Sequence, residues 1–206
     1  MHIDAFDLAD VMGWAHGRSG EIPESGSMRL RKRPEVSEVG AQRLGKWLFE
    51  RWSQPALRPD IVIVERAQEI AATFQRNVRS EDGAPAFSGS ADAVRSQILY
   101  HGALHAVAGL FDIEVYAPTA ATVRKHLCGT ASAAPPRKRG SPLRTSDEKR
   151  RDREATKRMV LDRLVMMRYL PRDCTDTDRA DAVAVWAWGD GSVARTAPRE
   201  LHLFAR

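Results

Sequence analysis

The apolar positions of the first thirty residues follow the two-residue period of β-strands. Residues 2–8 alternate apolar and polar side chains and end near Asp7, which predicts a strand. A second alternating run surrounds Gly13 and a third covers 27–30. These three runs predict an antiparallel meander.

From Val36 the period of the pattern changes to that of a helix. Apolar or small residues recur every three or four positions until Pro55, which predicts an amphipathic helix. The run "DIVIVE" follows, and its four consecutive β-branched residues predict a buried strand that ends at Glu65. Because a helix connects this strand to the meander, we expect it to lie parallel to the first strand.

The middle of the chain alternates helices with one more strand. Residues 66–90 are polar and contain glycine and proline, which is typical of a long functional loop. A helix over 91–110, a short strand at 113–117 and a helix over 119–127 are predicted next. The order of a meander followed by βαβα predicts an α/β fold with a mixed five-stranded sheet flanked by helices.

The last third of the chain is predicted to contain two helices. The segment "GTASAAPPRKRGSP" is Pro-rich and basic, so it is interpreted as a linker or loop. Thr145 and Glu148 fit a capping box, which predicts that a helix begins there. The apolar side of this helix is expected to run through Val160, Leu164 and Met167. A final helix is expected from about Asp178.

Composition narrows the class of protein. A chain of 206 residues with 43% hydrophobic residues predicts one globular domain. It has no apolar run that could span a bilayer, and its acidic N-terminus does not resemble a secretory signal, so a cytoplasmic protein is expected. Cys128 and Cys174 lack the spacing of a zinc site and are expected to be free thiols.

The positive charge is concentrated in one segment. The formal net charge is +5, and residues 137–158 contain ten Lys or Arg against four Asp or Glu. A basic segment of this kind is typical of a nucleic-acid contact, although a solvated charge run has the same composition.

Several acids stand at the ends of predicted elements. Asp178 and Asp181 are three residues apart, so they share one face at the start of a helix. The helix N-terminus stabilises each charge by only roughly 0.3–1 kcal/mol. Asp176 precedes this helix and is interpreted as a loop residue.

Asp7 and Glu65 end the two apolar strands that are expected to lie side by side. Both carboxylates would then emerge at one edge of the sheet, where sites in α/β folds form. Four converging acids would need hard cations such as Mg²⁺ or Mn²⁺. Taken singly, Asp178 is explained as a helix cap and Asp7 as a turn residue. Glu65 alone is explained as a partner of Arg66.

Five segments resemble successive blocks of the RuvC family of Holliday-junction resolvases, in the RNase H-like superfamily. They are "FDLADVMGWA", "IVIVERA", "YAPTAATVRKHLCGTASA", "EATKRMV" and "DRADAVAVW". The resemblance implies one RNase H-like nuclease domain over residues 1–206. It also implies a homodimer that nicks two strands symmetrically across a four-way DNA junction, with two Mg²⁺ or Mn²⁺ ions in each active site.

The same resemblance implies roles for individual residues. The metal-binding and catalytic carboxylates carry over to Asp7, Glu65, Asp178 and Asp181. Asp7 would bridge both ions, Asp181 would orient the attacking water, and Lys157 would stabilise charge at the scissile phosphate. DNA contacts are expected from Arg66, Arg124, Lys125, Arg137, Lys138, Arg139, Arg150, Arg151 and Lys157.

The chain departs from the family pattern at three places. Asp10 adds a carboxylate near the expected metals, and we expect it to be exposed to solvent rather than to support the metal site. Residues 134–153 resemble a basic insertion. The loop after Glu65 is long and has no clear base-stacking aromatic, for which Phe74 and Phe87 are the candidates.

Two other activities stay open from the sequence. The protein could be an RNase H-fold nuclease that acts on forks, flaps or RNA–DNA hybrids, or a junction-binding protein without catalysis. An ATP-binding relative is disfavoured because such proteins need glycine-rich phosphate turns, and "DLADVMG" has one glycine only.

The helix over 91–110 carries two further features. His101 and His105 are expected at the helix surface or in an interface, and a stripe of small residues predicts the dimer contact. The stripe is Gly102, Ala103, Ala106 and Gly109.

Overall fold

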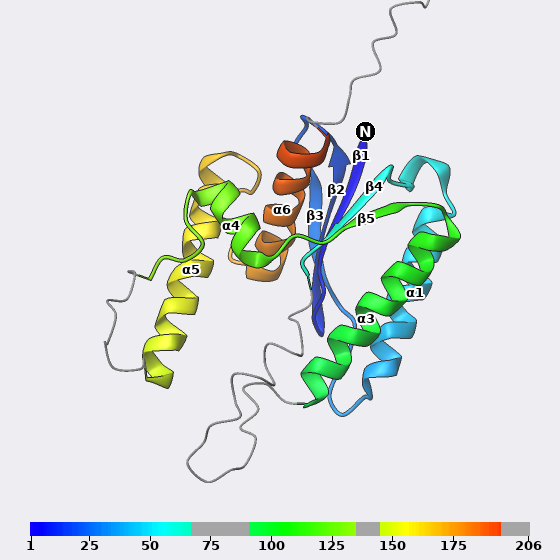
Figure 1. The fold of residues 1–206 in the computed structure, drawn as a ribbon, viewed down its shortest axis with the longest axis horizontal. Helices are drawn as coiled ribbons and strands as arrows, with labels where there is room; N and C mark the ends of the chain where they lie inside the picture. Colours follow the sequence, from blue (N-terminus) through cyan, green and yellow to red (C-terminus); the bar gives the residue numbers. More distant parts are fainter. Residues whose placement is uncertain (67–90, 135–144, 195–206) are drawn as a thin grey trace, which may run out of the picture.

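The computed structural model describes residues 1–66, 91–134 and 145–194. Its centre is a five-stranded sheet in the order β3-β2-β1-β4-β5 (Figure 1). The strands are β1 (His2–Asp7), β2 (Val11–Arg18), β3 (Glu24–Arg29), β4 (Ile61–Val64) and β5 (Glu114–Tyr116). The pairs β1–β2 and β2–β3 are antiparallel, and the pairs β1–β4 and β4–β5 are parallel. The predicted mixed sheet is therefore confirmed.

Helices cover both faces of this sheet. They are α1 (Ser37–Trp52), α3 (Ala91–Leu110), α4 (Ala120–Cys128), α5 (Ser146–Met166) and α6 (Thr177–Gly189), with short turns at Pro55–Leu57 and Asp190–Ala194. Helices α1 and α3 lie on one face, and α4, α5 and α6 lie on the other (Figure 1). Two hydrophobic cores follow, one on each side of the sheet.

The strands at the centre match the pattern of a doubly covered sheet. All four residues of β4 are buried, as the run of β-branched residues predicted. In β1, Ile3 and Ala5 pack with α6 in one core, while Phe6 packs with α1 and α3 in the other. Because successive side chains of β1 point to opposite faces of the sheet, this strand contributes residues to both cores.

The start of α5 is confirmed, and its predicted apolar side is partly wrong. Thr145 and Glu148 form the capping box, and Val160 and Leu164 are buried. Met167 is not part of that side: it is the C-cap residue and is 40% exposed. The helix ends there because the chain turns at Arg168, whose φ is +64°.

Asp176 is not the loop residue that the sequence suggested. It is the N-cap of α6, and its carboxylate accepts hydrogen bonds from the backbone N–H groups of Asp178 and Arg179, at 3.1 and 3.0 Å. The helix begins one residue earlier than predicted, at Thr177. Because Asp176 satisfies these donors, Asp178 is not needed as a cap.

Several predictions fall outside the described residues. They concern the loop over 67–90 with Phe74 and Phe87, and the basic residues Arg137, Lys138 and Arg139. The part of the predicted insertion that is described, from Ser146 to Arg153, forms the beginning of α5. Among the described helices, none combines the length and apolarity required to cross a bilayer.

Candidate active site

Asp7 and Glu65 lie next to each other because β1 and β4 are parallel and in register. Phe6 pairs with Val64, and the backbone N–H of Glu65 donates to the carbonyl of Phe6 at 3.2 Å. Asp7 is the last residue of β1, and Glu65 directly follows β4. Both acids therefore leave the same edge of the sheet, as predicted.

A close contact between β2 and α6 brings the second pair of acids to this edge. Gly13 pairs with Asp7 in the sheet, and a Cβ at Gly13 would lie 1.9 Å from the carbonyl oxygen of Asp178. Only glycine leaves room for this approach of the helix backbone. The first turn of α6 is thereby fixed beside Asp7. Figure 1 shows the N-terminal end of α6 at the same end of the molecule as the carboxyl end of β1.

Lys157 of α5 lies between the two acids of α6. Its Nζ is 3.3 Å from Oδ2 of Asp181, 3.7 Å from Oδ1 of Asp178 and 3.4 Å from the hydroxyl oxygen of Thr177. The Asp181 side chain is 17% exposed, and those of Lys157 and Asp178 are each 36% exposed. The ammonium therefore neutralises part of the negative charge from a half-buried position.

The four acids are coupled electrostatically. Burial, together with the charges of Asp181, Glu65 and Asp178, raises the pKa of Asp7 to about 7, against the lowering effect of Lys157. A carboxyl group surrounded by other carboxylates holds its proton more tightly. The other three acids of the site therefore all disfavour the ionised form of Asp7.

The pKa values of Glu65 and Asp181 are also raised. Burial raises the pKa of each, and they stand close enough for Asp181 to raise the pKa of Glu65. Arg124, on α4, lowers the pKa of both, and so does Lys157. These two cations therefore face the acids.

The donor set suits hard divalent cations. All four side chains offer carboxylate oxygens, which Mg²⁺ and Mn²⁺ prefer, and their mutual repulsion would be relieved by a cation. Within residues 1–66, 91–134 and 145–194, no three His, Cys, Asp or Glu side chains already stand in the geometry of a metal centre.

The other expected DNA contacts that the structure describes are exposed side chains. Lys125 lies exposed in the last turn of α4, and Arg150 and Arg151 lie exposed in the first two turns of α5. Arg66 is also exposed, and its Nε donates to the carbonyl of Ala117 at 3.2 Å. Arg66 thus has a partner other than Glu65.

Asp10 is tied into a network that the sequence did not reveal. Its carboxylate accepts hydrogen bonds from Nε and Nη2 of Arg31, at 3.0 and 2.8 Å, and from the hydroxyl of Tyr100 at 3.0 Å. The expectation of a simply exposed side chain is corrected: Asp10 is 38% exposed and ion-paired. Arg31 is buried because it has acidic partners on two sides.

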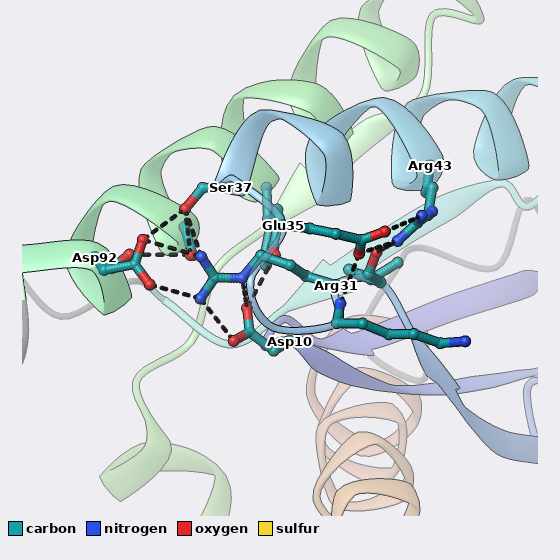
Figure 2. A network of polar contacts seen from close by, with 10 residues as sticks. Asp10, Arg31, Glu35, Ser37, Arg43 and Asp92 are labelled. Carbon is teal, nitrogen blue, oxygen red and sulfur yellow. Dashed lines mark hydrogen bonds and ion pairs between the residues drawn. The ribbon is translucent and has the colours of Figure 1, made fainter.

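Figure 2 shows how Arg31 joins segments that are far apart in the sequence. Besides Asp10, its guanidinium donates to Asp92 at the start of α3, at 2.9 and 2.8 Å, and to the hydroxyl of Ser37 at the start of α1, at 3.1 Å. Glu35 is bound by Arg43 instead, and this contact lowers the pKa of Glu35 to about 2. The network therefore fixes the turn that follows Asp7 to two helices.

The sequence contained signals for some of these features. A glycine in the middle of an alternating strand, such as Gly13, indicates that another backbone approaches closely. An aspartate two or three residues before an apolar helical run, such as Asp176, is typical of an N-cap. The partners of Arg31 had no comparable signal, because Asp10, Ser37 and Asp92 come from three separate segments.

The histidine pair and the cysteines are placed as expected. His101 and His105 stack with ring centroids 6.5 Å apart on α3, and burial together with His105 lowers the pKa of His101. His105 is exposed and His101 is half-buried. Cys128 and Cys174 are free thiols.

Comparison with known proteins gives a match in structure. No family model and no curated protein matches the sequence. The RuvC structure from Thermus thermophilus is similar with a TM-score of 0.55 and 16% identity, over 94% of this chain and 98% of that one. T. thermophilus RuvC in complex with a Holliday junction substrate is similar with a TM-score of 0.54 and 18% identity, over 90% of each chain. Since the likeness extends over the sheet and both helical layers, the chain has the RNase H-like fold of the RuvC resolvases.

Proposed function

We propose that this protein is a metal-dependent endonuclease that resolves four-way DNA junctions by nicking two strands symmetrically. One observation carries the proposal: acids at the ends of β1 and β4 and at the start of α6 converge at one edge of the sheet, where burial and their charges raise the pKa of Asp7 to about 7. The fold shared with RuvC supports the choice of substrate, because one of the similar structures contains a Holliday junction.

Each acid has a part in the proposed reaction. Asp7, Glu65, Asp178 and Asp181 would hold two Mg²⁺ or Mn²⁺ ions, which would supply an activated water and neutralise charge at the phosphate. Asp7 would be the central ligand, because the charges of the other three acids all act on it. Asp181 orients the attacking water from the first turns of α6.

Lys157 acts on the substrate in this proposal. Its ammonium is now shared by Asp178 and Asp181. If cations were bound by these acids, the attraction that holds Lys157 there would be weaker, and its ammonium would be available to a phosphate oxygen. A positive charge at that place stabilises the charge that develops during cleavage.

DNA binding relies on the basic residues around the acids. Arg124 faces them from α4, while Arg66, Lys125, Arg150 and Arg151 are available for the phosphates of the flanking strands. The basic segment over 137–139 adds to this set by sequence. Because these contacts are with phosphates, affinity should fall steeply as the salt concentration rises.

The proposed enzyme is a homodimer. Symmetric nicking of two strands requires two active sites related by a two-fold axis. On α3, a Cβ built at Gly102 or Gly109 has no neighbour within 4 Å among the described residues beyond its own turn of helix, so a second helix could approach these positions closely. Ile98 and Leu110 of the same helix are 50% and 73% exposed.

A junction-cleavage assay tests this function. Synthetic four-way junctions labelled on each strand should be nicked in Mg²⁺ or Mn²⁺ at two symmetric positions, and not in EDTA. Asp7→Asn should abolish nicking and retain junction binding. The matched control is Asp162→Asn, an exposed aspartate of α5 that should leave the rate unchanged.

The same assay separates the alternatives. Faster cleavage of forks, flaps or RNA–DNA hybrids than of four-way junctions would assign a different substrate to the site. Junction binding without nicking in either metal ion would indicate a binding protein.

A further inference from the structure

Two histidines on α3 form a pair that the proposed nuclease reaction does not use. His101 and His105 are four residues apart, so both side chains lie on one face of the helix, and their rings stack with centroids 6.5 Å apart. His105 is exposed and His101 is half-buried. Neither ring has a hydrogen bond to any other residue that the structure describes. The ring nitrogens are therefore available to a ligand.

Two histidines one helical turn apart are suited to holding a metal ion. At this spacing both imidazoles can reach the same ion, as they do in the helical H-E-x-x-H motif of zinc proteases. Imidazole nitrogen suits zinc, copper and nickel, whereas carboxylate oxygen suits Mg²⁺ and Mn²⁺. The histidine pair would therefore select a different class of metal ion from the acids at the edge of the sheet.

One chain supplies too few ligands for a closed zinc site. A structural zinc ion has four protein ligands in tetrahedral geometry. Within the described part of the chain, no third His, Cys, Asp or Glu side chain joins the pair in a metal-binding group. A two-fold dimer presents the same surface of both copies to each other. Two histidines from each copy would then make up the four ligands.

The face of α3 that carries the pair is open to a second copy. Gly102 lies next to His101 and three residues before His105, and a Cβ built there has no described neighbour within 4 Å beyond its own turn of helix. Ile98 precedes the two histidines by three and seven residues, so it lies on the same face, and it is 50% exposed. Two antiparallel α3 helices that cross near Gly102 would bring the two histidine pairs together beside apolar surface.

We propose that His101 and His105 bind an ion of the zinc class on the two-fold axis of the dimer, where the same two histidines of the second copy complete a tetrahedral site. The inference rests on the dimer of the proposed function. One ion is then shared by two chains. Because the complete site exists only in the dimer, the ion shifts the equilibrium between monomer and dimer towards the dimer.

Sedimentation velocity without DNA tests the shared site. At a Zn²⁺ concentration about 100 times the dissociation constant of the site, the dissociation constant of the dimer should fall by about 100-fold. His105→Ala should remove this response. His126→Ala, at an exposed histidine of α4, is the matched control and should retain it. A dimer dissociation constant that ignores Zn²⁺, or that responds equally in His105→Ala, would overturn the proposal.

The absorption spectrum of bound Co²⁺ identifies the ligands. Tetrahedral Co²⁺ with nitrogen ligands absorbs visible light strongly, whereas Co²⁺ with octahedral oxygen ligands absorbs it weakly, so the signal separates the histidines from the catalytic acids. The strong absorption should reach its end point at one Co²⁺ per two chains, in the wild type and in Asp7→Asn. It should be absent in His105→Ala. An end point at one ion per chain would overturn the sharing of the site.

Junction nicking in Mg²⁺, without Zn²⁺, keeps this inference separate from the nuclease function. Zinc-dependent dimerisation of a protein that never nicks would refute the nuclease and retain the metal site. Symmetric nicking by a protein whose dimerisation does not respond to Zn²⁺ would refute the metal site alone.

Discussion

At the scale of single residues, the unusual chemistry of Asp7 comes from its neighbours. Its ordinary pKa of 3.8 rises to about 7 through burial and through the charges of Asp181, Glu65 and Asp178. The folded protein therefore binds a proton at Asp7 between these pH values, and the unfolded chain does not. Stability from this group is greatest below pH 4 and is lost as the pH rises towards 7.

Asp7→Asn should consequently stabilise the metal-free protein at high pH. At pH 8 in EDTA, we expect the free energy of unfolding to increase by about 2–4 kcal/mol, because the variant removes an unfavourable charge. The gain in the free energy of unfolding should shrink towards pH 4.

Mg²⁺ should raise the melting temperature of the wild type more than that of the Asp7→Asn variant. Thermal unfolding at several pH values, with Asp162→Asn as control, measures both effects. An equal gain at pH 4 and pH 8 would contradict the assignment.

Lys157→Met should separate the action of the lysine on the phosphate from its competition with metal ions for the two acids of α6. If the ammonium acts on the phosphate, nicking should slow by roughly 10²- to 10³-fold. Mg²⁺ affinity should not fall, since Lys157 competes with cations for Asp178 and Asp181. Single-turnover rates and calorimetric titration with Mg²⁺ measure the two quantities. Lys46→Met, at an exposed lysine of α1, is the control. A loss of Mg²⁺ affinity with an unchanged rate at saturating metal would reject this role.

At the scale of elements, the start of α6 is the feature that organises the site. Asp176 caps the helix, and Gly13 allows its first turn to touch β2. The existence of the strands and the capping box of α5 were predicted correctly from local sequence, although β3 begins at Glu24 and not at Ser27. The first residue of α6 was predicted one position too late, because both Asp176 and Asp178 can cap a helix and local sequence does not rank them.

Asp176→Ala should therefore affect both stability and activity. Loss of the cap should lower the free energy of unfolding by about 1 kcal/mol. Nicking should slow as well, because the cap holds the backbone N–H of Asp178. Asp176→Ser is the matched control, since serine also caps helices. Urea denaturation and nicking rates should rank wild type and serine above alanine. Equal behaviour of the two variants would show that the cap has no such role.

At the scale of the whole molecule, the sheet separates two helical layers with different tasks. Helices α4, α5 and α6 carry Arg124, Lys157 and two of the acids, whereas α1 and α3 form the opposite layer (Figure 1). The network of Arg31 links that layer to the turn behind Asp7. The exposed face of α3 is thus physically connected to the site.

Gly102→Arg should weaken the proposed dimer and leave the monomer folded. A Cβ at Gly102 meets nothing within 4 Å, so the subunit itself has room for a side chain. At the centre of an interface, a bulky charge should raise the dimer dissociation constant by roughly thirty-fold or more. Gly45→Arg is the control, because Gly45 of α1 is equally open. Sedimentation velocity measures the dissociation constant. Identical behaviour of both variants would exclude α3 as the dimer contact.

From the amino-acid pattern alone we could predict the order of the elements, the mixed sheet and the positions of the four acids at the ends of strands or the start of a helix. These features follow from local periodicity and from the geometry of parallel strands. The groups that surround the acids became known from the fold alone: Lys157 between Asp178 and Asp181, the Asp176 cap and the Arg31 network. Such contacts depend on distances between residues far apart in the chain, and no local pattern encodes those distances.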